Sequence, residues 1–140
     1  MYSPLNQYQN NQVLTASPEK ILIMLYDGAI NFTRIAQERL LVKDVPGKGI
    51  YIGKALAIVT ELMNTLNHEV GGEIAAHLEQ LYLYLMDEYT KANMSYEMAH
   101  LENAVKILTI LRDTWKEAAE IVQRERVALL NEQHVSRMAG

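Results

Sequence analysis

Two of the four histidines stand in spacings that bind metal ions in other proteins. Glu97 and His100 have the Glu-x-x-His spacing by which one helix supplies two ligands to a di-iron site. Such a site also needs a second Glu-x-x-His pair and inward-facing glutamates on two further helices, and neither is found. His68 and Glu69 begin like a zinc-protease helix, but Gly72 stands where the second histidine would be. We therefore expect no metal site and no cofactor.

Histidine phosphotransfer is a second chemistry that helical proteins of this size perform. Phosphotransfer domains usually place a lysine and a glycine just after one exposed histidine, which lets a phosphate approach the helix. Leu-Glu-Gln follows His77 and Leu-Glu-Asn follows His100, so phosphotransfer remains only a minor alternative. The sequence contains no Gly-rich phosphate loop and no nucleophile elbow. Its lack of cysteine excludes thiol nucleophiles, thiolate metal sites and disulfides. We expect a protein that is not an enzyme.

Composition indicates a single domain and argues weakly against binding to nucleic acid. The chain has 140 residues, of which 49% are hydrophobic, and this is enough for one substantial core. A net charge of −4 without a cluster of basic residues argues against binding to phosphate backbones. The first residues are polar and do not resemble a secretory signal, and no apolar run approaches the ~20 residues of a membrane span. These features predict a cytoplasmic location and no membrane span.

Apolar residues recur at three- and four-residue spacing in four series separated by short breaks. This spacing is typical of amphipathic helices, and short connections require neighbouring helices to run antiparallel. The sequence therefore predicts an all-α fold, an antiparallel up-down-up-down four-helix bundle with an irregular N-terminal arm. The series are Leu22, Leu25, Ala29, Phe32 and Ala36; Ile52, Ala55, Val59, Leu62 and Leu66; Leu78, Leu81, Leu85, Tyr89 and Ala92; and Leu101, Val105, Leu108, Trp115, Ala119 and Val122.

Local signals predict where the helices begin and end. Ser17 suits an N-cap and Pro18 suits the first helical turn. The predicted helices run to about residue 43, from about 49 to 69, from about 73 to 92, and from about 95 into the 120s. The predicted organisation is a flexible arm over residues 1–16, a helical bundle over 17–127 and a frayed tail over 128–140. In the first helix, Gly28 indicates a close contact between helices.

Further apolar residues fall outside these series and exceed what a bundle core needs. Ile23, Tyr26 and Ile30 form one such row, and Ile107, Ile110 and Ile121 form another. These rows are consistent with additional packing or a dimer interface. They are equally consistent with exposed grooves that hold the amphipathic helices of a partner. Seven methionines modestly favour grooves, because flexible thioethers suit an adaptable surface.

Several motifs resemble the family of the flagellar export chaperone FliS. The most specific are the segments Val13–Lys20, read with the preceding Tyr8, and Met24–Ala29. Weaker matches follow in the expected order, and the resemblance covers roughly residues 5 to 120. These weaker matches are Lys54-Ala55, Gly71–Ala75, Leu81-Tyr82, Ala92-Asn93 and Trp115.

The resemblance implies a cytoplasmic chaperone that binds the C-terminal segment of flagellin, prevents premature polymerisation and assists delivery to the type III export gate. Export-gate or regulatory flagellar proteins are further expected partners. The resemblance also suggests that the N-terminal arm covers a client groove. A helical dimerisation or regulatory module without a flagellin client is the main alternative. The residues expected to contact the client are Tyr8, Ile52, Val59, Met63, Tyr82, Leu83, Tyr89, Ile107, Ile110 and Ile121.

Overall fold

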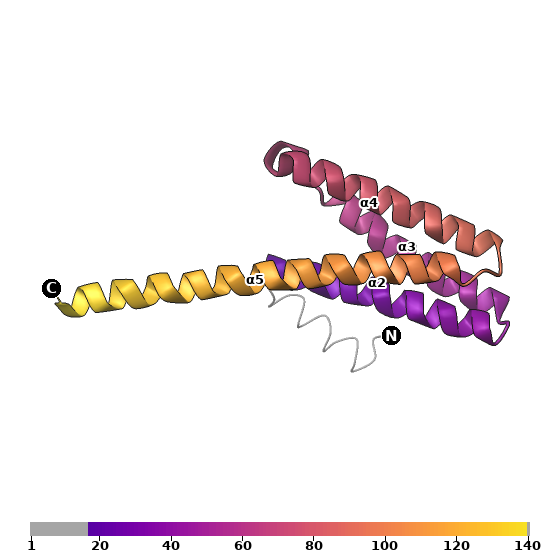
Figure 1. Ribbon diagram of the computed structural model, residues 1–140, viewed down its shortest axis with the longest axis horizontal. Helices are drawn as coiled ribbons and strands as arrows, with labels where there is room; N and C mark the ends of the chain where they lie inside the picture. The colour runs from indigo at the N-terminus through magenta and orange to yellow at the C-terminus, as the bar shows by residue number, and fades with distance from the viewer. Residues whose placement is uncertain (1–16, 140) are drawn as a thin grey trace, which may run out of the picture.

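The computed structural model describes residues 17–139, which form four helices (Figure 1). These helices are α2 (Pro18–Leu41), α3 (Val45–Asn64), α4 (His68–Met94) and α5 (Ala99–Ala139). Consecutive helices pack against each other, and α5 returns beside α2, so the contacts close into a ring. The short connections make neighbours antiparallel, which confirms the predicted all-α, up-down-up-down bundle.

Side-chain caps define the beginnings of the first three helices. Ser17 Oγ accepts a hydrogen bond from the backbone N–H of Lys20 at 3.4 Å, as expected of an N-cap. Asp44 Oδ1 accepts from the N–H of Gly47 at 3.0 Å and begins α3. Asn67 Oδ1 accepts from the N–H groups of Glu69 and Val70, both at 3.1 Å, and begins α4.

Two predicted boundaries were wrong because these last two caps were not recognised. Asp44 begins α3 at Val45, whereas the sequence predicted a start near residue 49. Asn67 begins α4 at His68, about five residues before the predicted start. The two glycines expected to end a helix lie inside α4 instead. Gly72 has φ 50° and ψ −123°, a conformation that favours glycine, and it interrupts the helical geometry there.

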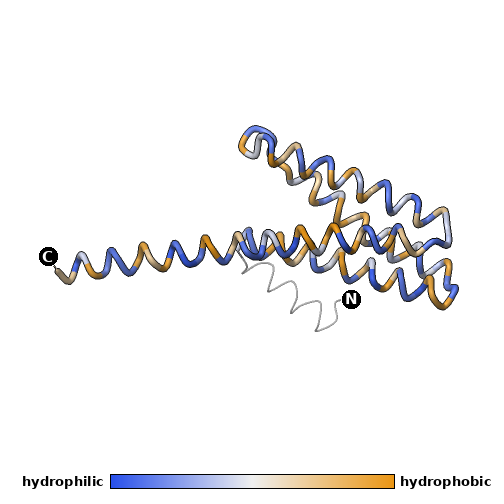
Figure 2. The backbone as a smooth tube through the Cα atoms, viewed as in Figure 1, coloured by the Kyte–Doolittle hydropathy of each residue, from blue (hydrophilic) through white to orange (hydrophobic). Residues whose placement is uncertain are grey.

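The largest difference from the sequence prediction concerns the C-terminal end. The tail over 128–140 was expected to fray, but α5 is helical as far as Ala139. From Glu120 onward every described residue is exposed, and this part of α5 projects beyond the bundle (Figure 1). Figure 2 shows hydrophobic and hydrophilic residues interspersed along it. Helical hydrogen bonds need no regular apolar stripe, and loss of that stripe was the basis of the wrong prediction.

Two polar layers of tyrosine lie within the core. The hydroxyl groups of Tyr26 in α2 and Tyr82 in α4 are hydrogen-bonded to each other. Nearer the other end, Thr33 Oγ1 donates to the carbonyl of Ala29 at 2.7 Å and lies 2.6 Å from the Tyr89 hydroxyl. Since the threonine proton is already used, Tyr89 donates to Thr33. Burial raises the pKa of Tyr89 to about 12. The diagonal pair α2 and α4 is therefore joined at two levels.

The close contact expected at Gly28 is present between α2 and α3. A Cβ atom at this position would lie 3.1 Å from Ile58 Cδ1, which is closer than most carbon contacts in proteins. Glycine therefore allows these two helices to approach each other.

Candidate helix-binding surface

The N-terminal part of α4 diverges from α5 (Figure 1). An apolar groove lies at this end of the bundle. Its volume is about 310 Å³, and all four helices contribute to its lining. We call it the wedge groove. Its principal apolar lining residues are Leu22, Leu66, Val70, Ile74, Leu78 and Trp115.

Apolar residues on both sides of the kink at Gly72 are exposed. Val70 precedes the kink and is 85% exposed, and Ile74 follows it and is also exposed. Ala75 is the first residue of α4 that the core buries. A Cβ atom at Gly71 would lie only 2.8 Å from Ala75 Cβ, so a larger side chain would require the local backbone to shift. The two glycines thus shape the opening of the wedge groove.

At their other ends, α4 and α5 are held together by a buried carboxylate. Glu88 Oε2 accepts a hydrogen bond from Asn103 Nδ2 at 3.1 Å and lies 3.1 Å from His100 Nδ1. The second ring nitrogen of His100 lies 3.4 Å from Glu97 Oε2. Buried charged groups are stable only when they are paired in this way. The contact identifies the sides of α4 and α5 that face each other.

Apolar rows extend along both helices from this contact toward the wedge groove. In an α-helix, residues three or four positions apart share one side. On α4, Tyr84 and Leu81 precede Glu88 at this spacing. On α5, Ile107 and Ile110 follow Asn103 at the same spacing. We call these the α4–α5 rows, and the α5 row continues through Thr114 to Ile121. Tyr84, Ile110 and Ile121 are exposed, whereas Leu81 and Ile107 are partly buried.

An ion pair holds α5 against α2 on the opposite side. Arg112 Nη1 lies 3.1 Å from Asp27 Oδ1, and Arg112 Nε lies 3.0 Å from the neighbouring Asp113. Hydrogen bonding to these carboxylates, chiefly to Asp27, raises the pKa of Arg112. The pairing fixes the orientation of α5 close to Trp115. It therefore stabilises the wall of the wedge groove that α5 forms, from the side that faces α2.

Five of the ten residues predicted to contact a client are at least partly accessible. Ile110 is 54% exposed, Leu83 and Ile121 are exposed, and Met63 and Ile107 are partly buried. Leu83 lies on the side of α4 away from the α4–α5 rows, since it is two residues from Leu81. Tyr8 lies outside the described residues, as does the whole predicted arm over 1–16.

At the other four positions the expected exposure was wrong. Ile52, Val59, Tyr82 and Tyr89 are each 2% exposed or less. Their spacing is that of the core-facing stripes of α3 and α4, so packing within the bundle already covers them. Tyr82 is also one of the residues that line the wedge groove.

The residues of the wedge groove were not predicted to form a surface. Leu22, Leu66, Leu78 and Trp115 were read as core because they continue the helical stripes. In the structure all four are only partly buried, because α4 diverges from the other helices at this end. One available signal was Gly71 and Gly72 between two apolar residues that lie off the main stripe, Val70 and Ile74.

Within residues 17–139, no group of three or more metal-ligating side chains comes together. In the same part of the chain, no helix has both the length and the apolar character needed to span a membrane.

A helical bundle with an apolar groove on its surface has the architecture of a helix-binding protein. The family model described as "Flagellar protein FliS" matches residues 1–122. The chain belongs to the FliS family of flagellar secretion chaperones. It is 32% identical over 124 residues to the flagellar secretion chaperone FliS of Bacillus subtilis, covering 89% of this chain and 92% of the relative.

Two further relatives carry the same description. The flagellar secretion chaperone FliS of Vibrio cholerae is 35% identical over 108 residues, with 76% of this chain and 78% of the relative covered. The flagellar secretion chaperone FliSB of Pseudomonas aeruginosa is 33% identical over 117 residues, with 79% and 91% covered. A secretion chaperone is not a class of enzyme. The comparisons favour neither a dimerisation module nor a phosphotransfer domain.

Proposed function

We propose that this chaperone binds the C-terminal helical segment of flagellin in the cytoplasm and keeps it from polymerising until export. Membership of the FliS family supports this function, and the apolar surface between α4 and α5 supports the location of the binding site. In this proposal the protein acts by binding alone and catalyses no reaction.

The observation that carries the proposal is the exposure of apolar residues along the α4–α5 rows and in the wedge groove. An amphipathic helix lies in a groove by placing residues at i, i+3, i+4 and i+7 against apolar side chains. Ile110 and Ile121 lie on the row, and Ile74 and Trp115 lie at its open end. A client helix along α5 would contact the row and then the groove.

Occupation of this surface explains how polymerisation is prevented. The terminal helices of flagellin assemble through their apolar faces, so a chaperone that covers such a face makes it unavailable. A standard interface of ~1,600 Å² is enough for specific binding. A segment that becomes ordered on binding pays a cost in conformational entropy, which lowers the affinity for a given buried area. This cost suits a complex that must later release its cargo.

Binding to a flagellin peptide tests both the function and the site. We expect a peptide of the C-terminal ~40 residues of flagellin, a length sufficient for several helical turns, to bind the full chain in calorimetry. Replacing Ile110 with aspartate should weaken binding at least about tenfold, because the charge must be desolvated in an apolar interface. Ile74→Asp tests the wedge groove in the same way.

Val135→Asp is the matched control, because Val135 is an exposed apolar residue on the projecting part of α5. It should leave the affinity unchanged, and circular dichroism should show that all three variants remain folded. Absence of binding by the unmodified chain would refute the proposed function. Full binding by folded Ile110→Asp and Ile74→Asp variants would refute only the site.

A further inference from the structure

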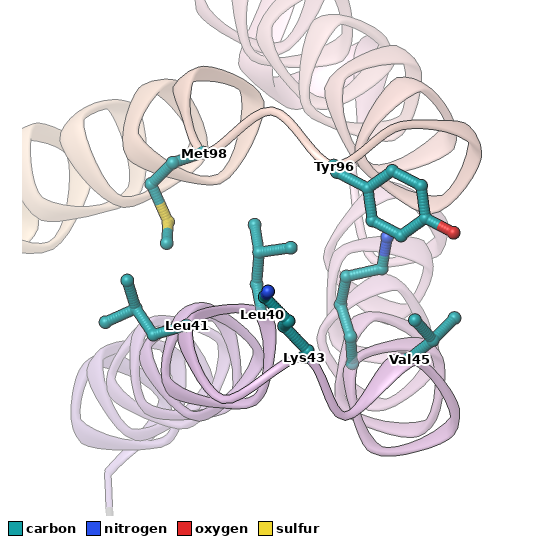
Figure 3. Close-up of a pocket in the computed structure, with 7 residues that line it drawn as sticks. Leu40, Leu41, Lys43, Val45, Tyr96 and Met98 are labelled. Carbon is teal, nitrogen blue, oxygen red and sulfur yellow. The ribbon is translucent and has the colours of Figure 1, made fainter.

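A second apolar cavity lies at the end of the bundle opposite the wedge groove (Figure 3). It is bounded by the connection between α2 and α3 and by the connection between α4 and α5, and its volume is about 630 Å³. We call it the end pocket. Leu40, Leu41, Val45 and Met98 supply aliphatic or thioether surface, and Tyr96 adds an aromatic ring. Binding pockets in proteins commonly have volumes in this range.

The rim of the end pocket carries apolar residues that no described part of the chain covers. Leu41 is 74% exposed and Tyr96 is 76% exposed. Val42, which follows Leu41, and Met94, the last residue of α4, are also exposed. Contiguous apolar residues on a surface are typical of interaction sites, whereas scattered ones are not. The end of the bundle therefore has the character of a docking surface.

The wall of the end pocket carries positive charge without carboxylate partners. Lys48 is 2% exposed, and its Nζ donates to the carbonyl groups of Ala92 at 2.9 Å and Ser95 at 2.7 Å. The same Nζ lies 5.4 Å from the centre of the Tyr96 ring. Lys43 lies at the mouth of the pocket (Figure 3). Within residues 17–139, neither lysine pairs with a carboxylate.

Two acidic residues, Asp44 and Glu97, are sequence neighbours of lining residues, and both have partners; Glu97 Oε2 lies 3.4 Å from His100 Nε2. Asp44 accepts from the N–H of Gly47 and lies 3.7 Å from Arg39 Nη1. The lining of the end pocket contains two lysines and no acidic residue. An occupant with apolar and negatively charged groups is therefore complementary both to its surface and to its charge.

Lys48 also fixes the shape of the pocket before any partner binds. Its side chain begins at the N-terminal end of α3 and reaches the last turn of α4, so it joins the two connections that form the walls. A cation at the C-terminal end of a helix is stabilised by the helix dipole. A preorganised site loses less conformational entropy on binding than a mobile one.

We propose that the end pocket is a second docking site, which binds an acidic amphipathic helix of a partner protein. Apolar side chains on one face of that helix enter between Leu41, Val45 and Met98. Carboxylates on its flank pair with Lys43. Because the end pocket and the wedge groove lie at opposite ends of the bundle, a partner bound here leaves the proposed flagellin site accessible.

Two model peptides test this proposal on the full chain. Each has about 20 residues, long enough to form a helix on binding, with leucine on one face and either glutamate or lysine on the other. Amide NMR spectra of the isotope-labelled protein should respond to the glutamate peptide at residues 40–48 and 94–98. The lysine peptide should produce no saturable change there.

Charge reversal at the mouth of the pocket provides a quantitative test. Lys43→Glu should weaken binding of the glutamate peptide about five- to tenfold, the range expected for one exposed charge pair and its reversal. Lys106→Glu is the control, because Lys106 is an exposed lysine on α5, and it should leave the affinity unchanged. Val45→Asp should also abolish binding, since it places a charge in the apolar wall.

Several results would overturn the proposal. Equal binding of both peptides, spectral changes confined to the α4–α5 rows, or full binding by a folded Lys43→Glu variant would each contradict it. Changes at the end pocket that depend on protein concentration without peptide would identify a second copy of the chain as the occupant. Saturable binding of decanoate without binding of the glutamate peptide would identify a small amphiphile instead.

Discussion

Tyr26 and Tyr82 are hydrogen-bonded to each other, hydroxyl to hydroxyl, across the centre of the bundle. Each is 2% exposed or less, so water does not replace this hydrogen bond. Burial raises the pKa of both phenols. Since α2 and α4 are diagonal partners, this pair fixes their relative position at the level of the wedge groove.

Removing both hydroxyls of this pair should destabilise the fold by less than the sum of the two single removals. Tyr26→Phe or Tyr82→Phe leaves a buried hydroxyl without its partner, which costs about 1–3 kcal/mol. In the double variant neither hydroxyl of the pair remains, so its loss should be smaller than the sum of the single losses. Urea denaturation measures these differences. Tyr84→Phe, at an exposed position, is the control, and strictly additive losses would contradict the interpretation.

Alkaline pH should destabilise the protein through its buried phenols. Burial raises the pKa of Tyr89 from 10.0 to about 12. Below pH 10.0 the phenol is neutral in both folded and unfolded chains. Between about pH 10 and about pH 12 the unfolded chain ionises first, so the free energy of unfolding falls as the pH rises.

Denaturation at a series of pH values measures this decrease. Tyr89→Phe should make the decrease shallower, and Tyr96→Phe, which removes an exposed phenol, should not change it. An unchanged slope in Tyr89→Phe would show that the Tyr89 phenol does not contribute.

Lys48 should be necessary for stability as well as for the shape of the end pocket. Lys48→Met preserves much of the apolar side chain but leaves the carbonyl groups of Ala92 and Ser95 without their donor. We expect a loss of about 1–3 kcal/mol in the free energy of unfolding. Lys106→Met removes an exposed lysine and should have little effect. Equal stability of the two variants would show that water satisfies both carbonyl groups.

Removal of the N-terminal segment tests the prediction made for Tyr8. If residues 1–14 cover a client groove, their deletion should leave affinity for the flagellin peptide equal or greater, because the client no longer competes with the segment. Calorimetry on the deletion variant and on the full chain measures the difference. Tyr8→Ala, with the rest of the segment intact, separates the effect of the ring from that of the chain length. A marked loss of affinity would instead make the segment part of the binding site.

Helical periodicity was sufficient to predict the fold. One residue from each stripe, Ala29, Val59, Leu85 and Leu108, is fully buried, and short connections allowed only antiparallel packing. Helix ends were harder to predict, because Asp44 and Asn67 act as caps only in the local geometry that the folded chain provides. Loss of the apolar stripe after Val122 did not indicate loss of helix, since the hydrogen bonds of a helix are internal to its backbone.

The site could be predicted only in part because periodicity does not show where helices separate. Ile52 and Trp115 both continue a core stripe, yet Ile52 is buried and Trp115 borders the wedge groove. The difference comes from the course of α4, whose N-terminal part diverges from α5 (Figure 1). The end pocket depends on Lys48, and a lysine between two glycines gave no indication that it would be buried.

The length of α5 has a consequence for how the molecule responds to heat. At 1.5 Å per residue, its 41 residues extend about 60 Å, and the outer part has no buried side chain. Apart from an exposed pair between Arg126 and Glu19 at 3.8 Å, little ties that part to the bundle. Most of the stability of a protein helix comes from packing of one face against the rest of the fold, which this part lacks. Circular dichroism should therefore show helix melting at temperatures where the fluorescence of Trp115 still reports an intact bundle.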